Sequence, residues 1–168
     1  MDVKSMVRVK DIPEATRWRM ATHVLTRLVV ALGSREESGK EISSFQKRVC
    51  SEMADAILDI ADRYKMPRDN AADLVQTLGA VSVILFGPEF ETRYIEGFPE
   101  EAVIRLAECP MFSEDASRGI PPEQVNSVCR AYVANAVRAL NDDFTITVTK
   151  ARCLGDSFCE MIIERRSP

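Results

Sequence analysis

Apolar residues recur at helical spacing in the first two-fifths of the chain and predict two helices there. The first begins at the capping pair Asp11 and Glu14, ends at Gly33, and carries the stripe Trp18, Ala21, Leu25, Leu28 and Leu32, flanked by Val24 and Val29. The second begins at the capping pair Ser38 and Glu41, ends before Pro67, and carries the stripe Ile42, Phe45, Val49, Met53, Ile57, Ile60 and Tyr64. Steps of three and four residues between apolar positions are typical of amphipathic α-helices.

Two further segments continue the helical pattern. The segment Ala71–Phe86 follows the capping residues Asp69 and Asn70 and is apolar nearly all round, which predicts a buried central helix. Its last part, Val81–Phe86, fits a strand equally well, because periodicity does not decide for so short a run. The segment Glu123–Leu140 carries the clearest stripe of the chain: Val125, Val128, Cys129, Tyr132, Val133, Ala136, Val137 and Leu140.

Alternating apolar and polar residues predict two β-hairpins, one on each side of the last helix. The expected strands are Thr92–Ile95 and Ala102–Glu108 around the turn Gly97-Phe98-Pro99, and Phe144–Thr149 and Cys159–Glu164 around the turn Leu154–Ser157, with a loop at Phe112–Pro122. This order of elements predicts an α+β fold in which about four helices pack on one small antiparallel sheet formed by the two hairpins. We expect a single domain over residues 1–168, with a helical half at about 11–88 and a hairpin–helix–hairpin half at about 89–166.

Composition limits the classes of function. With 46% hydrophobic and 29% charged residues, the 168-residue chain is typical of globular proteins rather than disordered ones. Its net charge of −4 and lack of a basic stretch argue against nucleic-acid binding. No secretory signal is recognisable, and no apolar run approaches the roughly 20 residues of a membrane span. We therefore expect a cytoplasmic protein that does not enter a membrane and whose five cysteines are reduced.

Four of the five cysteines, Cys109, Cys129, Cys153 and Cys159, fall in the last sixty residues. Cys153 and Cys159 flank the last turn, so closure of that hairpin would bring them close together. Together with Cys109 at a strand end and Cys129 on the last helix, they could hold a zinc ion tetrahedrally. The alternative is that they are small buried apolar residues, since the spacing is not that of a zinc finger and contains no Cys-x-x-Cys.

Other residues suggest a small-molecule cavity. Trp18, Tyr94 and Tyr132 combine an apolar ring with a polar tip, which suits a ligand-binding wall as well as it suits the core. The single histidine, His23, lies between Arg19 and Arg27 on the polar side of its helix and is expected to be solvated. A nucleophile–histidine pair would need this helix to lie beside a cysteine or a serine.

The segment from Phe144 to Cys159 ends in Gly155-Asp156-x-x-Cys159 and resembles the close of two related families. One is the L-2-amino-thiazoline-4-carboxylic acid hydrolase-like family, which the chain also resembles in its helical N-terminal half, its Cys109-Pro110 strand end and its helix near Cys129. The other is the vinyl-reductase-type sensor domain of aromatic-responsive regulators.

Two alternative functions follow. The first resemblance implies a small-molecule-binding domain that opens a thiazoline-like ring by hydrolysis, with Cys159, Cys109 and Asp156 as the catalytic candidates. The alternative is a non-catalytic domain that senses a ligand or metal or assembles as a homodimer, because the nearly all-apolar segment Ala71–Phe86 and the striped segment Glu123–Leu140 could each donate surface to a dimer. Sensor domains carry zinc on a glutamate and three cysteines; two of those positions here are Val148 and Ala151, so Cys153 would have to substitute.

Overall fold

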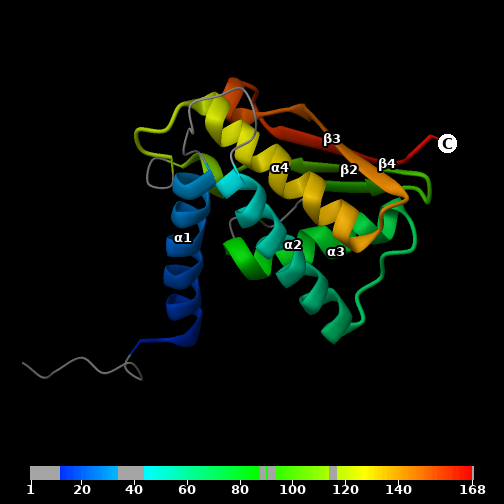
Figure 1. The fold of residues 1–168 in the computed structure, drawn as a ribbon, viewed down its shortest axis with the longest axis horizontal. Coiled ribbons are helices and arrows are strands. Elements are labelled where there is room, and N and C mark those ends of the chain that lie inside the picture. Colours follow the sequence, from blue (N-terminus) through cyan, green and yellow to red (C-terminus); the bar gives the residue numbers. More distant parts are fainter. Residues whose placement is uncertain (1–11, 34–43, 88–89, 91–93, 114–116, 168) are drawn as a thin grey trace, which may run out of the picture.

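The structure is a computed structural model, and it describes residues 12–33, 44–87, 90, 94–113 and 117–167. It confirms the predicted α+β fold, in which helices and one antiparallel sheet share a core (Figure 1). No helix among these residues is both long enough and apolar enough to cross a membrane.

The four long helices lie where the periodicity predicts them: α1 (Glu14–Gly33), α2 (Ser44–Tyr64), α3 (Ala71–Phe86) and α4 (Pro122–Leu140). Asn70 caps α3, since its side chain accepts a hydrogen bond from the backbone N–H of Asp73 at 3.0 Å. The ambiguous stretch Val81–Phe86 is helical, because the helix continues unbroken to Gly87 at φ +97°. The expected capping pair of α2, Ser38 and Glu41, lies outside the described residues.

The two hairpins form one four-stranded antiparallel sheet in the order β1-β2-β4-β3. Its strands are β1 (Tyr94–Gly97), β2 (Glu101–Leu106), β3 (Phe144–Lys150) and β4 (Cys159–Arg165). The central pair sets Ile104 opposite Met161 and Leu106 opposite Cys159. Two short 3-10 helices, which the sequence did not predict, follow β2 and β3: η3 (Pro110–Phe112) and η4 (Arg152–Leu154).

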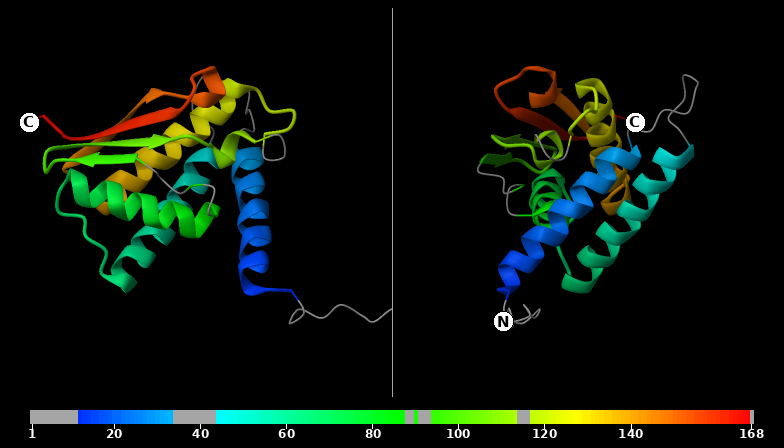
Figure 2. Two further views of the ribbon diagram at one scale, coloured as in Figure 1. Left: turned by 180° about the vertical axis from the view of Figure 1, so that it is seen from behind. Right: turned by 90° about the vertical axis from the view of Figure 1, so that its left-hand side faces the viewer.

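The helices form two layers on one side of the sheet. Helices α3 and α4 pack directly on the strands, while α2 packs on α4, and α1 contacts α2 and α3 (Figure 2). The core lies between α3, α4 and the sheet, and its largest fully buried side chains include Tyr132, Phe86 and Phe144. Helix α1 stands at the end of the molecule away from the C-terminus, where it also contacts η3.

The apolar stripe of α1 does not face the core. The buried side of α1 consists of Thr22, Thr26, Val29 and Val30. The residues of the stripe are instead at least 37% exposed: Trp18, Leu25, Leu28 and Leu32, as are the neighbouring Met20 and Val24. Periodicity identifies the helix, but it does not say which of its sides is buried.

Candidate functional site

Four thiols from separate elements surround one small cavity. Cys109 lies between β2 and η3, Cys129 on α4, Cys153 on η4, and Cys159 at the start of β4. The remaining wall is almost entirely apolar and is formed by Phe90, Leu106, Val125, Asn126, Val148, Ala151 and Met161. The cavity holds about 10 Å³, which is about the space of one water molecule. In this conformation the cavity therefore has no room for an organic ligand.

Two of these thiols share a hydrogen bond. The thiol of Cys109 donates a hydrogen bond to the sulfur of Cys159 and lowers the pKa of Cys159 to about 6. The backbone N–H of Arg152, 3.3 Å from the same sulfur, acts in the same direction. The pKa of Cys109 rises, chiefly because its proton is held in that bond and because the group is buried. Cys159 is thus the thiol of the cluster that ionises first.

The other two thiols keep their protons. Burial raises the pKa of Cys129 to about 12, and the neighbouring Cys159 adds to the shift. Burial also raises the pKa of Cys153. Cys50, the fifth cysteine, lies on α2 and its pKa is raised by burial alone. All five cysteines are free thiols.

Asp156, predicted as a catalytic residue, closes the turn before β4. Its carboxylate accepts a hydrogen bond from the N–H of Ala151 at 2.8 Å, and its own N–H donates to the Ala151 carbonyl at 3.3 Å. Gly155, directly before it, has φ +105°, a conformation that side chains rarely adopt. The Gly-Asp motif therefore fixes the turn that places Cys153 and Cys159 at the same cavity.

Two of the aromatic residues predicted to bind a ligand, Trp18 and Tyr132, are not among the described lining residues of either cavity. The ring of Tyr132 is 2% exposed and packs edge-on against Phe86, and its hydroxyl shares a 3.0 Å hydrogen bond with Ser82. Burial raises the pKa of Tyr132. The indole N–H of Trp18 donates to the carbonyl of Ile84 at 3.2 Å. The side chain of Tyr94 lies outside the described part of the structure.

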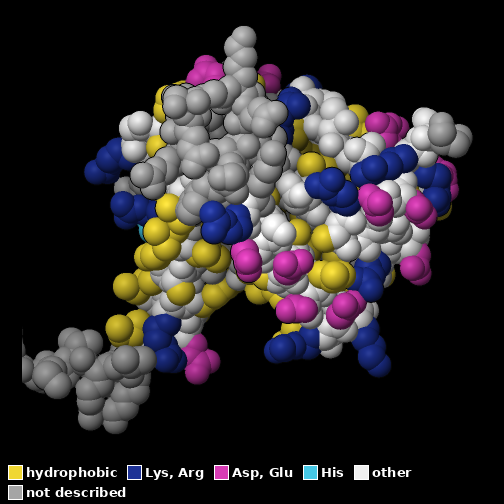
Figure 3. All heavy atoms as spheres, in the orientation of Figure 1, with side chains coloured by type: hydrophobic (Ala, Val, Ile, Leu, Met, Phe, Trp, Pro, Cys, Tyr) yellow, Lys and Arg dark blue, Asp and Glu magenta, His cyan; other side chains and the backbone are white. Residues whose placement is uncertain are grey.

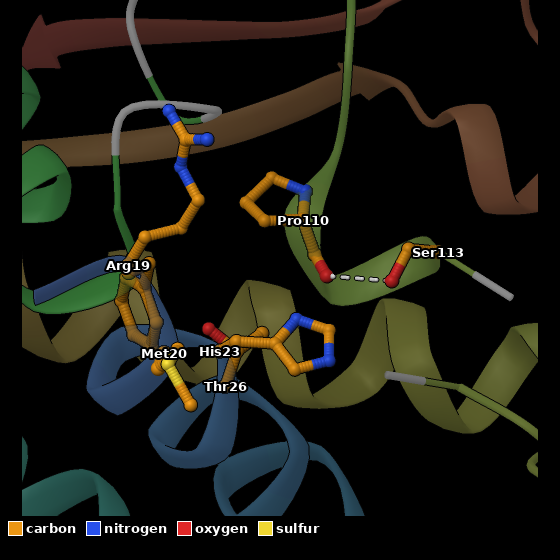
Figure 4. A pocket seen from close by; sticks show the side chains of 7 residues that line it. Arg19, Met20, His23, Thr26, Pro110 and Ser113 are labelled. Atoms are coloured by element: carbon orange, nitrogen blue, oxygen red, sulfur yellow. Dashed lines mark hydrogen bonds between the residues drawn. The ribbon is translucent and has the colours of Figure 1, made fainter. Parts of the chain in front are cut away.

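A larger, open pocket lies between α1 and η3 (Figure 4). It has a volume of about 390 Å³, and its described lining residues are Arg19, Met20, His23, Thr26, Phe86, Pro110 and Ser113. Arg19 and His23 extend from α1 toward η3, where the hydroxyl of Ser113 donates to the Pro110 carbonyl at 3.4 Å. The contact of α1 with η3 thus brings the single histidine and a serine to one pocket.

The two cavities share a wall. Pro110 lines the open pocket and follows Cys109, which lines the thiol cavity. Phe86 lines the open pocket and packs against Phe90, with ring centroids 5.5 Å apart, and Phe90 lines the thiol cavity. The two cavities are therefore neighbours.

Within the described ranges, no three His, Cys, Asp or Glu side chains are arranged so that they could hold a metal ion. The zinc site expected on Cys109, Cys129, Cys153 and Cys159 therefore has no support from their arrangement. In its hydrogen bond with Cys159, the thiol of Cys109 keeps its proton. Cys109 would have to lose that proton to bind a metal ion as a thiolate.

Comparison with known proteins gives no family. No family model matches the chain, and no curated protein matches it. One solved structure that matches is trafficking protein particle complex subunit 3 from Naegleria fowleri, covalently bound to palmitic acid. It is 14% identical, with 95% of this chain and 86% of that chain covered at a TM-score of 0.33. This backbone likeness is too loose to carry a function over.

Proposed function

We propose that this protein binds a small organic anion with an apolar body in the pocket between α1 and η3. The observation that carries the proposal is the lining of that pocket. Its volume of about 390 Å³ falls in the range of small-molecule sites. Phe86, Met20 and Pro110 offer an apolar surface, while Arg19 offers a cation that suits a carboxylate.

The polar groups also favour an anion over a cation. Arg19 and His23 both present nitrogen donors, and Thr26 and Ser113 present hydroxyls. A ring carrying one carboxylate, such as the thiazoline carboxylate implied by the sequence resemblance, matches this combination in size and charge.

Fluorescence of Trp18 provides a direct binding assay, because this residue precedes Arg19 on α1 and is the chain's single tryptophan. The probes are 2-amino-thiazoline-4-carboxylate and benzoate, with neutral benzamide for comparison. We expect the two carboxylates to bind and Arg19→Ala to weaken them by about ten- to a hundredfold, the worth of a charge-assisted hydrogen bond.

Arg27→Ala is the matched control, since Arg27 lies on the same helix, is exposed, and is not a lining residue of the pocket. It should leave both affinities unchanged. Equal affinity of the carboxylates for the Arg19→Ala variant and the unmodified protein would refute the proposal, as would binding of neither carboxylate.

A hydrolase is the second candidate function, favoured by the low pKa of Cys159, about 6, which supplies a nucleophilic thiolate at neutral pH. A substrate in the open pocket would reach Cys159 only after Phe86 and Phe90 move apart. The test is release of the ring-opened product from 2-amino-thiazoline-4-carboxylate, measured by mass spectrometry. Turnover that is lost in Cys159→Ala would establish the hydrolase; binding without turnover would leave the sensing alternative.

A further inference from the structure

The four thiols around the small cavity lie largely beneath the surface of the molecule. On the face shown in Figure 3, apolar side chains gather along α1, and charged side chains of both signs are spread over the other visible surfaces. Cys153 and Cys159 are 8% and 6% exposed, while Cys109 and Cys129 are half-buried. The cavity between them holds about 10 Å³, and the rest of its wall is almost entirely apolar. A reagent that reaches these thiols must therefore be small and uncharged.

Cys109 and Cys159 are in contact through their sulfur atoms. The thiol of Cys109 donates a hydrogen bond to the sulfur of Cys159, which sets the two sulfur atoms side by side. Cys129 and Cys153 line the same cavity, and each interacts with Cys159 through charge. A disulfide bond is about 2 Å long and forms only between sulfur atoms that can approach each other closely. Of the thiols at the cavity, Cys109 and Cys159 are the pair best placed to form one.

Arg152 holds together the two segments that carry this pair. Its backbone N–H donates to the sulfur of Cys159 at 3.3 Å. Its guanidinium donates to the carbonyl of Ala107, two residues before Cys109. The positive charge of the guanidinium also favours the ionised form of Cys159. Because the thiolate is the form that attacks an oxidant, Arg152 both positions the pair and favours its reactive state.

We propose that Cys159 and Cys109 are an oxidation site for hydrogen peroxide, the smallest hydroperoxide, which converts the pair to a disulfide. This proposal does not rest on either function proposed above. In the first step the thiolate of Cys159 attacks one peroxide oxygen, so that a sulfur–oxygen bond forms and the oxygen–oxygen bond breaks. The departing hydroxide takes up a proton and becomes water. The sulfur of Cys159, now a sulfenic acid, has given two electrons to the peroxide.

Cys109 completes the reaction as the resolving thiol. Its sulfur attacks the sulfur of the sulfenic acid, so that a sulfur–sulfur bond forms and the sulfur–oxygen bond breaks. The leaving hydroxide takes the proton of Cys109 and becomes a second water. Two thiols and one hydrogen peroxide thus give one disulfide and two water molecules. A dithiol reductant reverses the modification and restores both thiols.

The disulfide acts on the open pocket through η3. Cys109 directly precedes Pro110, which lines that pocket. The carbonyl of Cys109 also accepts a hydrogen bond from the backbone N–H of Phe112 at 3.1 Å, which closes the turn of η3. Drawing the sulfur of Cys109 from hydrogen-bond contact to bond length moves this residue toward Cys159. We therefore expect oxidation to displace η3 and to change the shape of the pocket.

Peptide mapping identifies the oxidised pair. The full chain is treated with hydrogen peroxide at neutral pH, its remaining thiols are alkylated during denaturation, and it is digested with trypsin without reduction. Trypsin leaves Cys109 in peptide 106–118, Cys129 in peptide 119–130, and both Cys153 and Cys159 in peptide 153–165. We expect peptides 106–118 and 153–165 to be joined within one chain, and a dithiol reductant to separate them.

Single substitutions assign the role of each thiol. Cys159→Ser should abolish the link, whereas Cys153→Ala should keep it, which assigns the linked sulfur in peptide 153–165 to Cys159. Cys109→Ser should also abolish the link but leave a sulfenic acid on Cys159, which dimedone traps. Cys129→Ala is the matched control, because Cys129 lines the same cavity and its replacement should leave the yield of the link unchanged.

Several results would overturn the proposal. One is that the thiols of the unmodified protein stay unreacted in peroxide, or are oxidised only to sulfinic and sulfonic acids. Another is a link to peptide 119–130, a link between two chains, or peptide 153–165 unlinked and lighter by two hydrogen atoms, which marks a bond between Cys153 and Cys159. Hydrogen exchange tests the effect on η3: its amides should change their exchange rates on oxidation of the unmodified protein but not of Cys159→Ser. Equal rates in the reduced and the fully oxidised protein would overturn the connection to the pocket.

Discussion

The ionised state of Cys159 depends on one neighbour, Cys109, and replacing that neighbour by alanine tests the thiol cluster directly. The hydrogen bond from Cys109 is the largest cause of the low pKa of Cys159, about 6 against an ordinary 9.0. At pH 7 a thiol with this pKa is about nine-tenths ionised, whereas an unperturbed thiol is about one per cent ionised. Cys109→Ala should return Cys159 to the protonated form at neutral pH.

Ultraviolet absorbance of the thiolate is the suitable assay, because it requires no reagent to reach a side chain that is only 6% exposed. The titration is run on protein treated with a chelator, so that no metal contributes. We expect one thiolate to appear with a midpoint near pH 6 in the unmodified protein and to vanish in Cys159→Ala. Cys50→Ala is the control, because burial raises the pKa of Cys50 and that thiol is protonated throughout the window.

The same coupling predicts how the free energy of unfolding varies with pH. Between pH 6 and 9 the folded pair has lost one proton that the unfolded chain keeps, so the free energy of unfolding rises with pH in this range. This contribution is lost as the pH falls through 6. Above pH 9 stability declines, since folded Cys109 keeps a proton that the unfolded chain releases.

Urea unfolding across this pH range measures the slope, and the slope below pH 9 should disappear in Cys109→Ala. A thiolate signal that persists at neutral pH in Cys109→Ala would refute the reasoning. Absence of any thiolate below about pH 8 in the unmodified protein would refute it too.

Three substitutions test the packing that supports the two cavities. Tyr132→Phe leaves the buried hydroxyl of Ser82 without its partner and should lower the free energy of unfolding by about 1–3 kcal/mol; adding Ser82→Ala should recover part of the loss in urea titrations. Asn70→Ala removes the cap of α3 and should cost about 1 kcal/mol, whereas an unchanged urea midpoint would contradict the cap. Gly97→Ala places a Cβ 2.9 Å from a side-chain carbon of α3, and hydrogen exchange should then report faster exchange of β1 amides than in the unmodified protein.

The helices and strands could be predicted because their signals are local. The Asn70 cap and the continuous apolar run of α3 lie within one segment, and the register of β2 against β4 follows from alternation of inward residues such as Ile104 and Ile163. The short helices η3 and η4 could not be predicted, since each is a single turn between a strand and a loop.

Helix α1 shows where periodicity stops being informative. The side of α1 that carries Leu25, Leu28 and Leu32 is more hydrophobic than the side that carries Thr22 and Thr26. The pattern alone would therefore place the leucine side in the core. The structure buries the threonines, because their hydroxyls bond within the helix and their small side chains suit close contact with neighbouring elements. Which face is buried depends on those neighbours, and they are far away in the sequence.

The thiol cavity is easier to predict from the sequence than the open pocket is. Cys153 and Cys159 lie close together because one turn, closed by Asp156, joins their elements. The pairing of β2 with β4 brings the end of β2, which Cys109 follows, to the same place. These are consequences of hairpin geometry, so the sequence could predict that the thiols gather. The open pocket instead requires α1 to meet η3, about ninety residues later, and no pairing rule fixes that contact. That His23 and Ser113 line one pocket is therefore visible only in the folded chain.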